Sequence, residues 1–423
     1  MIRMTSAQRS TPGPVTARVL YLTNQSPFPP HSGGQLREWQ FLSRLSHAYA
    51  VHLVAVTSHL RRDLGCAGEL LKHCRTVTFI QAVPGAAAPG TPERLRAVMS
   101  AEVAPCLAQF ARRNQLDFVH VEGYFLMHHL PAELGLPIFL VEENIEYQLD
   151  RARQELDGDT GTDWTVTRSL ERQAWRRAAR CGAVTLEDVA AIRSYLQSAA
   201  VHWLPPGCDH FSPDDPAGAI LAGLPTSGPR VVYTGNASWG PSRDATWYLL
   251  DEIWPKVHAA VPEAHLVIAG SGQRPAELGR PNLDRSVHLC GVLPSLGPLL
   301  HSADVFVCPL RFGGGIKSKI LESLRAGRAI VSSPVGLQGL PPPARDSVLE
   351  GGTTAELADR IIALLLDRGL REELQAKARA AARFLTTWDD ATRRLDAAWS
   401  AMLTSARAGQ GGGPEALGRL PSA

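Results

Sequence analysis

GGGIKSKILESLRAG, residues 313–327, is the stretch that decides the fold of this chain. Apolar strand patterns precede it at 305–310 and follow it at 329–331. The glycines therefore lead from a strand into a helix, whose free N–H groups and positive dipole end favour an anion. Lys317 and Lys319 add positive charge, and Glu322, one to two turns into the helix, can accept hydrogen bonds from sugar hydroxyls. The stretch predicts a site for a nucleoside diphosphate attached to a sugar.

The same stretch has a plainer interpretation. Glycine-rich turns between strand and helix also occur without a ligand, with their lysines solvated. The segment lacks the Gly-Lys-Ser/Thr ending of a P-loop. It also lacks the Gly-x-Gly-x-x-Gly spacing of a dinucleotide fingerprint, which disfavours a nicotinamide cofactor. We therefore expect no cofactor, only a nucleotide sugar as co-substrate.

Strand and helix patterns alternate along the whole chain, which predicts an α/β fold of parallel sheets covered by helices. The strands expected in the first half are 18–22, 51–56, 77–80, 118–121, 138–141, 183–185 and 201–204. Those expected in the second half are 230–234, 265–269, 287–289, 305–310 and 329–332. They predict two Rossmann-like, doubly wound domains facing a central cleft. Glycine loops at 33–34 and 313–315 each follow a strand, so both are expected at that cleft.

Proline, glycine and polar residues mark the expected domain boundaries. The first domain is predicted over 18–205 and the second over 230–388, with a linker at 206–229. Helices are expected near 353–367 and 370–384. A terminal helix, 389–404, is expected to return to the first domain. Residues 1–17 and 405–423 are predicted to be a disordered leader and a disordered tail.

Composition excludes several classes of protein. The 423 residues are 44% hydrophobic and 20% charged, which are globular values, and a net charge of +2 gives no case for bulk nucleic-acid binding. No apolar run reaches the length of a membrane span, and no secretory signal is visible. The seven cysteines form no Cys-x-x-Cys pair, which fits a reduced cytoplasm. No His/Cys cluster has metal-ligand spacing, so no metal is expected.

Further motifs stand in order along both halves. The first half has GG at 33–34, DFVHVE at 117–122, EENIEY at 142–147 and an Arg-rich element at 176–189. The second has YTGN at 233–236, LVIAGSG at 266–272 and ADVFVCP at 303–309, ahead of the stretch at 313–327. In order and spacing they resemble family-4 retaining glycosyltransferases of the GT-B fold, over roughly residues 18–405. The second half carries the stronger resemblance.

The resemblance implies that a donor nucleotide sugar binds on the second domain, and UDP is our first choice of nucleotide. It implies that Glu322 binds ribose hydroxyls, while Lys317 and Lys319 neutralise the diphosphate, which helps it leave without a metal. Backbone amides at Gly33 and Gly34 would approach the donor phosphates from the opposite wall. The donor-binding set is Gly33, Gly34, Asn236, Arg243, Gly314, Gly315, Lys317, Lys319 and Glu322.

Three positions depart from the family pattern. Members often carry Glu-x7-Glu; Glu322 matches the second glutamate, but Gly314 stands where the first is expected. Lys317 replaces a common arginine and so lacks its bidentate fork. Arg243 is only a loose substitute for the Arg and Lys that usually follow the first strand of the donor domain. These departures concern the identity of the donor sugar more than the fold.

Polar residues at strand ends of the first domain are the candidates for the acceptor side. His120 and Glu122 could position the transferred sugar or the acceptor hydroxyl. A histidine at the end of a strand is as often a polar residue that makes its hydrogen bonds within the fold and has no functional role. Glu143, Asn144 and Glu146 follow the next expected strand and could bind a cationic or polyhydroxylated acceptor. The family has no generally established protein nucleophile, so we assign no catalytic base.

The resemblance implies a retaining glycosyltransferase. A related subgroup transfers N-acetylglucosamine or glucose from UDP donors to 2-deoxystreptamine in aminoglycoside antibiotic assembly. We therefore choose a hexose or N-acetylhexosamine as the transferred sugar, with UDP-N-acetylglucosamine as the first choice of donor and 2-deoxystreptamine as the first choice of acceptor, which acidic residues such as Glu142 would suit. Alternatives are a transferase for exopolysaccharide or lipid-linked glycans, a nucleotide-sugar epimerase and a non-catalytic nucleotide-sugar-binding protein. A helix with arginines at 168, 172, 176, 177 and 180 could contact a membrane surface, but a solvated face is the favoured interpretation. The oligomeric state is not indicated.

Overall fold

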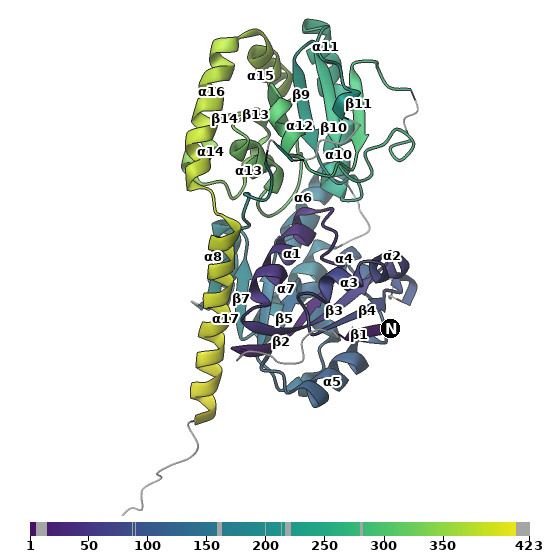
Figure 1. Cartoon of the computed structure of the whole chain (residues 1–423), viewed down its shortest axis with the longest axis vertical. Helices are drawn as coiled ribbons and strands as arrows, with labels where there is room; N and C mark the ends of the chain where they lie inside the picture. The colour runs from purple at the N-terminus through teal and green to yellow at the C-terminus, as the bar shows by residue number, and fades with distance from the viewer. Residues whose placement is uncertain are drawn as a thin grey trace, which may run out of the picture.

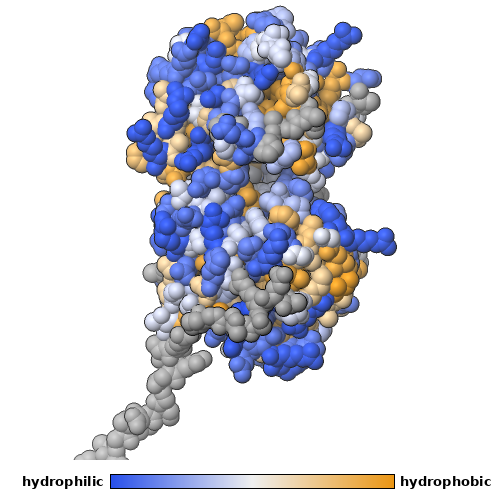
Figure 2. All heavy atoms as spheres, in the orientation of Figure 1, coloured by the Kyte–Doolittle hydropathy of each residue, from blue (hydrophilic) through white to orange (hydrophobic). Residues whose placement is uncertain are grey.

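Two parallel sheets, each in its own lobe, form the molecule (Figure 1). The computed structural model describes residues 1–5, 15–86, 88, 90–158, 163–198, 200–212, 214–215, 221–279 and 282–411. The lobes meet at a narrower waist in the space-filling view (Figure 2). The predicted α/β class, with two Rossmann-like domains facing each other, is confirmed.

The first sheet has eight strands in the order β1-β4-β3-β2-β5-β6-β7-β8. All neighbours are parallel except β1, which runs antiparallel to β4. The strands are β1 Ile2–Thr5, β2 Ala17–Thr23, β3 Tyr49–Thr57, β4 Thr76–Gln81, β5 Phe118–Glu122, β6 Ile138–Glu142, β7 Arg180–Ala183 and β8 Val201–Trp203. Beside β2 the strand order reverses, which is the topological switch point of such sheets and the edge where ligands bind.

The helices of the first domain are α1 Gly33–Leu45, α2 Leu60–Leu64, α3 Ala67–Leu70, α4 Glu93–Ala97, α5 Val103–Asn114, α6 Glu146–Asp157, α7 Trp164–Arg177 and α8 Leu186–Leu196. Side chains from α5, α7 and α8 pack on one face of the sheet. Those of α1, α3 and the last helix of the chain pack on the other. Both faces are covered, which explains the continuous apolar strands.

The second sheet has six parallel strands in the order β11-β10-β9-β12-β13-β14. Its strands are β9 Arg230–Thr234, β10 His265–Ala269, β11 Val287–Gly291, β12 Val305–Cys308, β13 Ala329–Ser332 and β14 Val348–Glu350. Its helices are α10 Gly240–Tyr248, α11 Trp254–Ala260, α12 Gly297–Ser302, α13 Ser318–Arg325, α14 Pro342–Arg345, α15 Thr354–Leu366 and α16 Arg368–Ala381. The strand order reverses at β9, between β10 and β12.

The last helix, α17 (Trp388–Gly411), leaves the second domain and runs along the first (Figure 1). Trp388 and Trp399 are buried in the first-domain core, and the Trp388 ring meets that of Phe41 on α1 edge-on. The segment that leads to α17 lies against the earlier crossing between the domains. A Cβ on Gly207 would lie only 2.4 Å from the backbone nitrogen of Trp388. The domains are thus joined by two crossings in contact.

Four elements differ from the sequence expectations. Ile2–Thr5, within the expected disordered leader, forms strand β1, because its backbone completes the sheet edge at β4; residues 6–14 lie outside the described part. Helix α17 continues past 404 to Gly411, and the rest of the expected tail, 412–423, also lies outside it. Strand β7 spans Arg180–Ala183 and not the expected 183–185, because Thr185 caps α8 by accepting from the Asp188 N–H. Strand β14, only three residues long, was not expected.

Candidate functional site

A cleft of about 1190 Å³ lies between the two lobes, at the carboxyl ends of both sets of strands. The first-domain wall contains the loop after β2, the start of α1, and the residues that end β5 and β6. The opposite wall contains the loops after β9, β10 and β12 and the start of α13. Both topological switch points therefore open into one cavity, which is large enough for a nucleotide and a second small molecule.

Lys317 precedes α13 and is almost fully buried, although it lines the cleft. Its ammonium donates to the carbonyls of Gly314 and Gly315, at 3.0 and 2.7 Å, and to Oε1 of Gln338 at 3.3 Å. Burial lowers the pKa of Lys317 to about 8. The ammonium group thus fixes the glycine loop by donating to two carbonyls of that loop, and it places a positive charge behind the loop.

Lys319, one position inside α13, is half-buried and lines the cleft. Its ammonium lies 4.5 Å from the ring centroid of Tyr233 and donates to the Tyr233 hydroxyl at 3.2 Å. It also donates to Oγ of Ser242 at 3.4 Å. These partners are neutral, so the charge of Lys319 is held in place without being neutralised, beside the loop that an anion would approach.

Glu322 lies one turn further along α13 and also lines the cleft. One of its oxygens, Oε1, is 3.5 Å from Nε2 of His210. Asn236, after β9, lines the cleft and accepts from the N–H of Ser238 at 2.9 Å, which fixes the turn. Arg243, by contrast, is exposed, lies over the ring of Trp247, and is not part of the cleft lining. Two of the predicted donor residues, Gly315 and Arg243, are thus outside the cleft lining. The others line the cleft together: Gly33, Gly34, Asn236, Gly314, Lys317, Lys319 and Glu322.

Gly33 and Gly34 begin helix α1, which Ser32 caps by accepting from the Gln35 N–H. A Cβ on Gly33 would lie 3.1 Å from Oγ of Ser318 on the other domain. A Cβ on Gly34 would lie 2.7 Å from the carboxylate of Glu143. These contacts show that the first turn of α1 faces the start of α13 across a narrow gap. Two helix N-termini therefore point into one cleft, an arrangement suited to a diphosphate.

The glycine loop of the second domain also meets the first. A Cβ on Gly314 would lie 2.9 Å from Cβ of Asn144. Gly315 has a φ of +61°, and a Cβ there would lie 2.2 Å from the carbonyl oxygen of Glu143. Residues without side chains are needed at both positions for the lobes to approach this closely.

Glu122, at the end of β5, is the centre of a buried polar network. It accepts from Nη1 of Arg37 at 2.8 Å, from the hydroxyl of Tyr21 at 2.5 Å and from Nε2 of His120 at 2.8 Å. Burial alone would disfavour its charge, but Arg37 and these donors outweigh burial and lower the pKa of Glu122 to about 2. The residue lines the cleft as a carboxylate with its oxygens already engaged.

His120 lies beneath Glu122 and outside the cleft lining. It is fully buried, stacked on Tyr21, and its Nδ1 is 3.2 Å from Nε1 of Trp399 on α17. Because an indole N–H only donates, Nδ1 accepts and the proton of the neutral ring lies on Nε2, facing Glu122. Burial lowers the pKa of His120. The geometry gives His120 a supporting place behind Glu122 and no direct path to a substrate.

The remaining acceptor-side candidates lie at the end of β6 and the start of α6. Glu143, Asn144 and Glu146 all line the cleft. Asn144 donates to Glu146 Oε1 at 3.3 Å, and the same oxygen is 3.4 Å from Nε of Arg94. Burial raises the pKa of Glu146. Glu142 also lines the cleft, but it accepts a hydrogen bond from Nε1 of Trp175 at 3.0 Å and therefore has a structural role as well.

The lining residues that were not singled out from the sequence include Arg37, Glu38, Arg94 and His210. The first two are on the buried face of α1, where helical spacing alone suggests nothing more than a salt-bridged helix. Arg94 comes from a separate short helix. His210 lies in the expected linker. For these four residues, the one usable signal in the sequence was the position of Arg37, one turn after Gly33 and Gly34.

The basic run on and just after α7 is used within the fold. Arg168 lies over Trp164, while Arg172 and Arg176 lie over Tyr195. Arg177 and Arg180 donate to backbone carbonyls, among them those of Leu130 and Ala401. Among the described residues, no helix is long and apolar enough to cross a membrane. In that same part of the chain, no three His, Cys, Asp or Glu residues are placed to hold a metal ion together.

Comparison with known proteins finds a family match in the second domain. Residues 228–367 match the family described as Glycosyl transferases group 1. The phosphatidyl-myo-inositol mannosyltransferase of Mycobacterium tuberculosis H37Rv is 31% identical over 179 residues, 39% of this chain and 45% of that protein. The D-inositol 3-phosphate glycosyltransferase of Xylanimonas cellulosilytica is 27% identical over 219 residues, 46% of this chain and 50% of that protein. The chain thus spans about half the length of the curated relatives it matches.

Solved structures resemble nearly the whole chain. Sucrose-phosphate synthase from Thermosynechococcus elongatus superposes with a TM-score of 0.72 at 16% identity, over 92% of this chain and 100% of that one. HepE of Anabaena, in complex with UDP and glucose, superposes with a TM-score of 0.63 at 14% identity, over 91% of this chain and 100% of that one. The chain has the GT-B fold of these structures. Its second domain matches the model of the group 1 glycosyl transferases over residues 228–367.

Proposed function

We propose that the chain is a retaining glycosyltransferase that moves a sugar from a nucleotide sugar to a hydroxyl group of an acceptor bound on the first domain. One observation supports this most: the starts of α1 and α13 face each other across the cleft, and Lys319, held by the Tyr233 hydroxyl, lines the cleft beside them. Helix N–H groups and a held cation stabilise the charge that develops on a departing diphosphate.

The other residues take roles consistent with this reaction. Glu322 accepts hydrogen bonds from the ribose hydroxyls, and Lys317 stiffens the loop and adds a second charge behind it. Glu143, Asn144 and Glu146 contact the acceptor at the first-domain wall. Contact of the lobes at Gly314 and Gly315 excludes water, which would otherwise hydrolyse the donor.

The donor is proposed to be a UDP-linked or GDP-linked hexose. HepE of Anabaena was solved with UDP and glucose, and one relative is a GDP-mannose-dependent mannosyltransferase of Corynebacterium glutamicum, 31% identical over 159 residues. We place UDP-N-acetylglucosamine, our first choice from the sequence, behind these two, because the matched relatives named for a sugar are mannosyltransferases.

The acceptor is proposed to be an inositol-like or lipid-linked glycan hydroxyl. This reverses our order of preference from the sequence, because the matched relatives are named for phosphatidyl-inositol and inositol 3-phosphate and none for an aminocyclitol. A cationic aminocyclitol such as 2-deoxystreptamine stays the second candidate. One observation favours it: five glutamates line this wall, at 38, 122, 142, 143 and 146, against Arg37 and Arg94.

A donor and acceptor panel tests the proposal. UDP-glucose, UDP-N-acetylglucosamine and GDP-mannose are each incubated with myo-inositol, phosphatidylinositol vesicles or 2-deoxystreptamine, with and without chelator, and products are identified by mass spectrometry. We expect transfer with retained anomeric configuration, unchanged by chelator. A changed sugar nucleotide without any acceptor would indicate an epimerase instead. Nucleotide binding with no turnover on any acceptor would contradict the transferase.

Lys319→Ala is expected to lower kcat by about 100-fold, because loss of one preorganised donor at a developing charge costs this much. The fold should survive, since Lys319 is half-buried and only its neutral partners lose a contact. Lys256→Ala, on the exposed side of α11, is the matched control. Unchanged turnover in the Lys319 variant would remove the phosphate role.

A further inference from the structure

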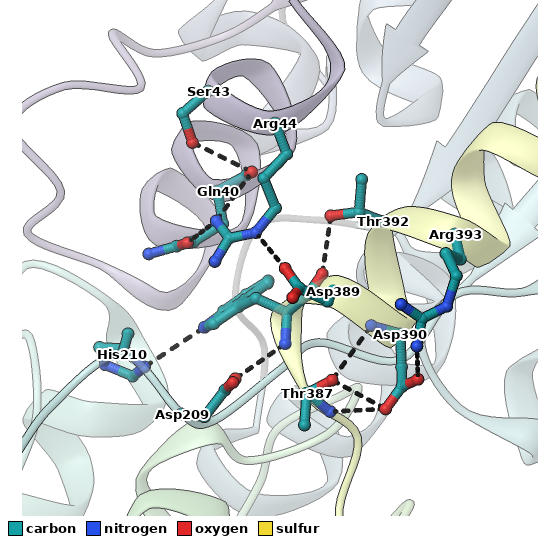
Figure 3. Close-up of polar contacts among 11 residues, drawn as sticks. Gln40, Ser43, Arg44, Asp209, His210, Thr387, Asp389, Asp390, Thr392 and Arg393 are labelled. Carbon is teal, nitrogen blue, oxygen red and sulfur yellow. Dashed lines mark hydrogen bonds and ion pairs between the residues drawn. The ribbon is translucent and has the colours of Figure 1, made fainter. Parts of the chain in front are cut away.

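His210 lies in the segment that crosses from the first domain to the second, and it lines the cleft. Its side chain, 18% exposed, stands between a residue of the second domain and one of the terminal helix. Nε2 is 3.5 Å from Glu322 Oε1, and Nδ1 is 3.4 Å from Nε1 of Trp388. Figure 3 shows His210 and Asp209 beside the start of α17.

The partner at Nδ1 decides which ring nitrogen carries the proton. An indole N–H can only donate, so Nδ1 of His210 accepts the hydrogen bond from Trp388. A neutral imidazole then carries its proton on Nε2, the nitrogen that faces Glu322. Trp388 therefore directs the N–H of the neutral ring toward Glu322, whose Oε1 lies 3.5 Å from Nε2, at the outer limit of hydrogen-bond distance.

Trp388 is itself held by the first domain. Its indole is 1% exposed and packs edge-on against Phe41 of α1. Its backbone N–H donates to Oδ1 of Asp209 at 2.8 Å, and the next residue, Asp389, pairs with Arg44 of α1 at 2.9 Å (Figure 3). Glu322 is thus connected, through His210, to the core of the opposite domain.

We propose that His210 is a positioning residue for the donor nucleotide: it holds the Glu322 carboxylate in the orientation that accepts the ribose hydroxyls. The proposal rests on the proposed function of the cleft. A glutamate on a helix otherwise loses rotamer freedom when a ligand binds, and a preset carboxylate avoids most of that loss. Because the Trp388 side of the link belongs to the first-domain core, the ribose contact depends on how the two domains are placed.

Calorimetry with matched nucleotides tests the inference. UDP and GDP are titrated into the full-length protein, and the tighter of the two is compared with its 2′,3′-dideoxy form, which lacks the hydroxyls. His210→Ala should weaken binding of the ribonucleotide by about five- to tenfold, the effect of one ordinary hydrogen bond. It should leave binding of the dideoxy form unchanged. A general loss of structure would weaken both.

Three further variants sharpen the result. His210→Gln, whose amide can still donate, should restore most of the ribonucleotide affinity. Trp388→Phe keeps the packing but removes the indole donor, and should show a smaller loss in the same direction. In a Glu322→Ala background, His210→Ala should cost nothing more, because the two residues act as one unit. His258→Ala, on α11 and away from the cleft lining, is the control.

An equal loss for both nucleotide forms, or no loss for either, would overturn the role of His210 while leaving the transferase proposal intact. If the wild-type protein binds neither UDP nor GDP, the proposed function fails and the inference fails with it. A further loss from His210→Ala in the Glu322→Ala background would show that His210 acts independently of Glu322, and would also overturn the inference.

Discussion

Lys317 is a cation that the fold keeps away from water, and this makes nucleotide binding depend on pH. Burial lowers its pKa to about 8, so the free protein loses this charge as pH rises through that value. A bound diphosphate favours the ammonium and raises the pKa in the complex. Affinity is therefore highest below pH 8. If binding raises the pKa of Lys317 by one unit, the affinity falls by about tenfold in total once the pH is above the pKa of the complex.

Titration of UDP or GDP by calorimetry between pH 7 and 9.5 checks this prediction. Lys317→Met should bind more weakly and lose the pH dependence in this range. An affinity that stays flat in the wild-type protein would show that the Lys317 charge does not reach the ligand.

Arg37 is the counter-charge of the buried carboxylates on the first-domain wall. It is 2% exposed and pairs with Glu122 at 2.8 Å and Glu143 at 3.4 Å. Arg37→Met leaves Glu122 charged and uncompensated in a buried position, which should lower the free energy of unfolding by about 3–5 kcal/mol. Urea denaturation measures the change. Arg61→Met, at an exposed position of α2, should stay within about 0.5 kcal/mol of wild type. A similar small change in the Arg37 variant would mean that water reaches Glu122.

At the scale of the element, the loop that ends at α13 needs glycine for two separate reasons. Gly315 has a φ of +61°, and a Cβ there would meet the Glu143 carbonyl of the other domain at 2.2 Å. Gly279 has a similar φ of +67° but nothing within 4 Å of a Cβ. Gly279→Ala should therefore cost only the backbone strain, about 1–2 kcal/mol.

Gly315→Ala should cause the same backbone strain and should also push the two lobes apart, because the new Cβ would collide with the Glu143 carbonyl. An error of about 1 Å at a reacting centre can cost about 100-fold in rate, and we expect a loss of kcat on this scale. Turnover and the radius of gyration from small-angle scattering measure the two effects. If both alanine variants behaved alike, the contact between the lobes would have no part in the reaction.

The same loop illustrates how far the sequence leads. Spacing and glycines predicted a strand, a turn and a helix start, and the structure confirms this order. The sequence also placed His120 and Glu122 at the end of a strand, and β5 ends at Glu122. The sequence could not predict the direction of a side chain. Lys317 points back to its own loop, and Arg243 lies on the surface. His120 is covered by Trp399, a contact 279 residues away in the chain that no local pattern contains.

At the scale of the whole molecule, α17 makes the first domain discontinuous in sequence. Five large apolar side chains of this helix are buried in the first-domain core: Trp388, Leu395, Trp399, Met402 and Leu403. Burial of each contributes about 1.5–3 kcal/mol, so their loss is comparable to the whole stability of a domain.

A chain that ends at Thr386 should therefore lose the cooperative unfolding of its first domain while the second domain stays folded. Urea denaturation followed by near-UV circular dichroism measures this. A synthetic peptide of residues 387–411 should restore the lost transition. Two intact transitions in the shortened chain without the peptide would contradict the prediction.

The position of α17 also sets an order of events during translation. Residues 1–205 leave the ribosome first, yet their core lacks one of its covering helices until residues 388–403 have been made. The second domain, whose strands all lie between 230 and 350, has every strand available before then. The domain that is synthesised last is thus the first that can finish folding, and the nascent first domain must wait with an apolar face uncovered, where a chaperone would bind.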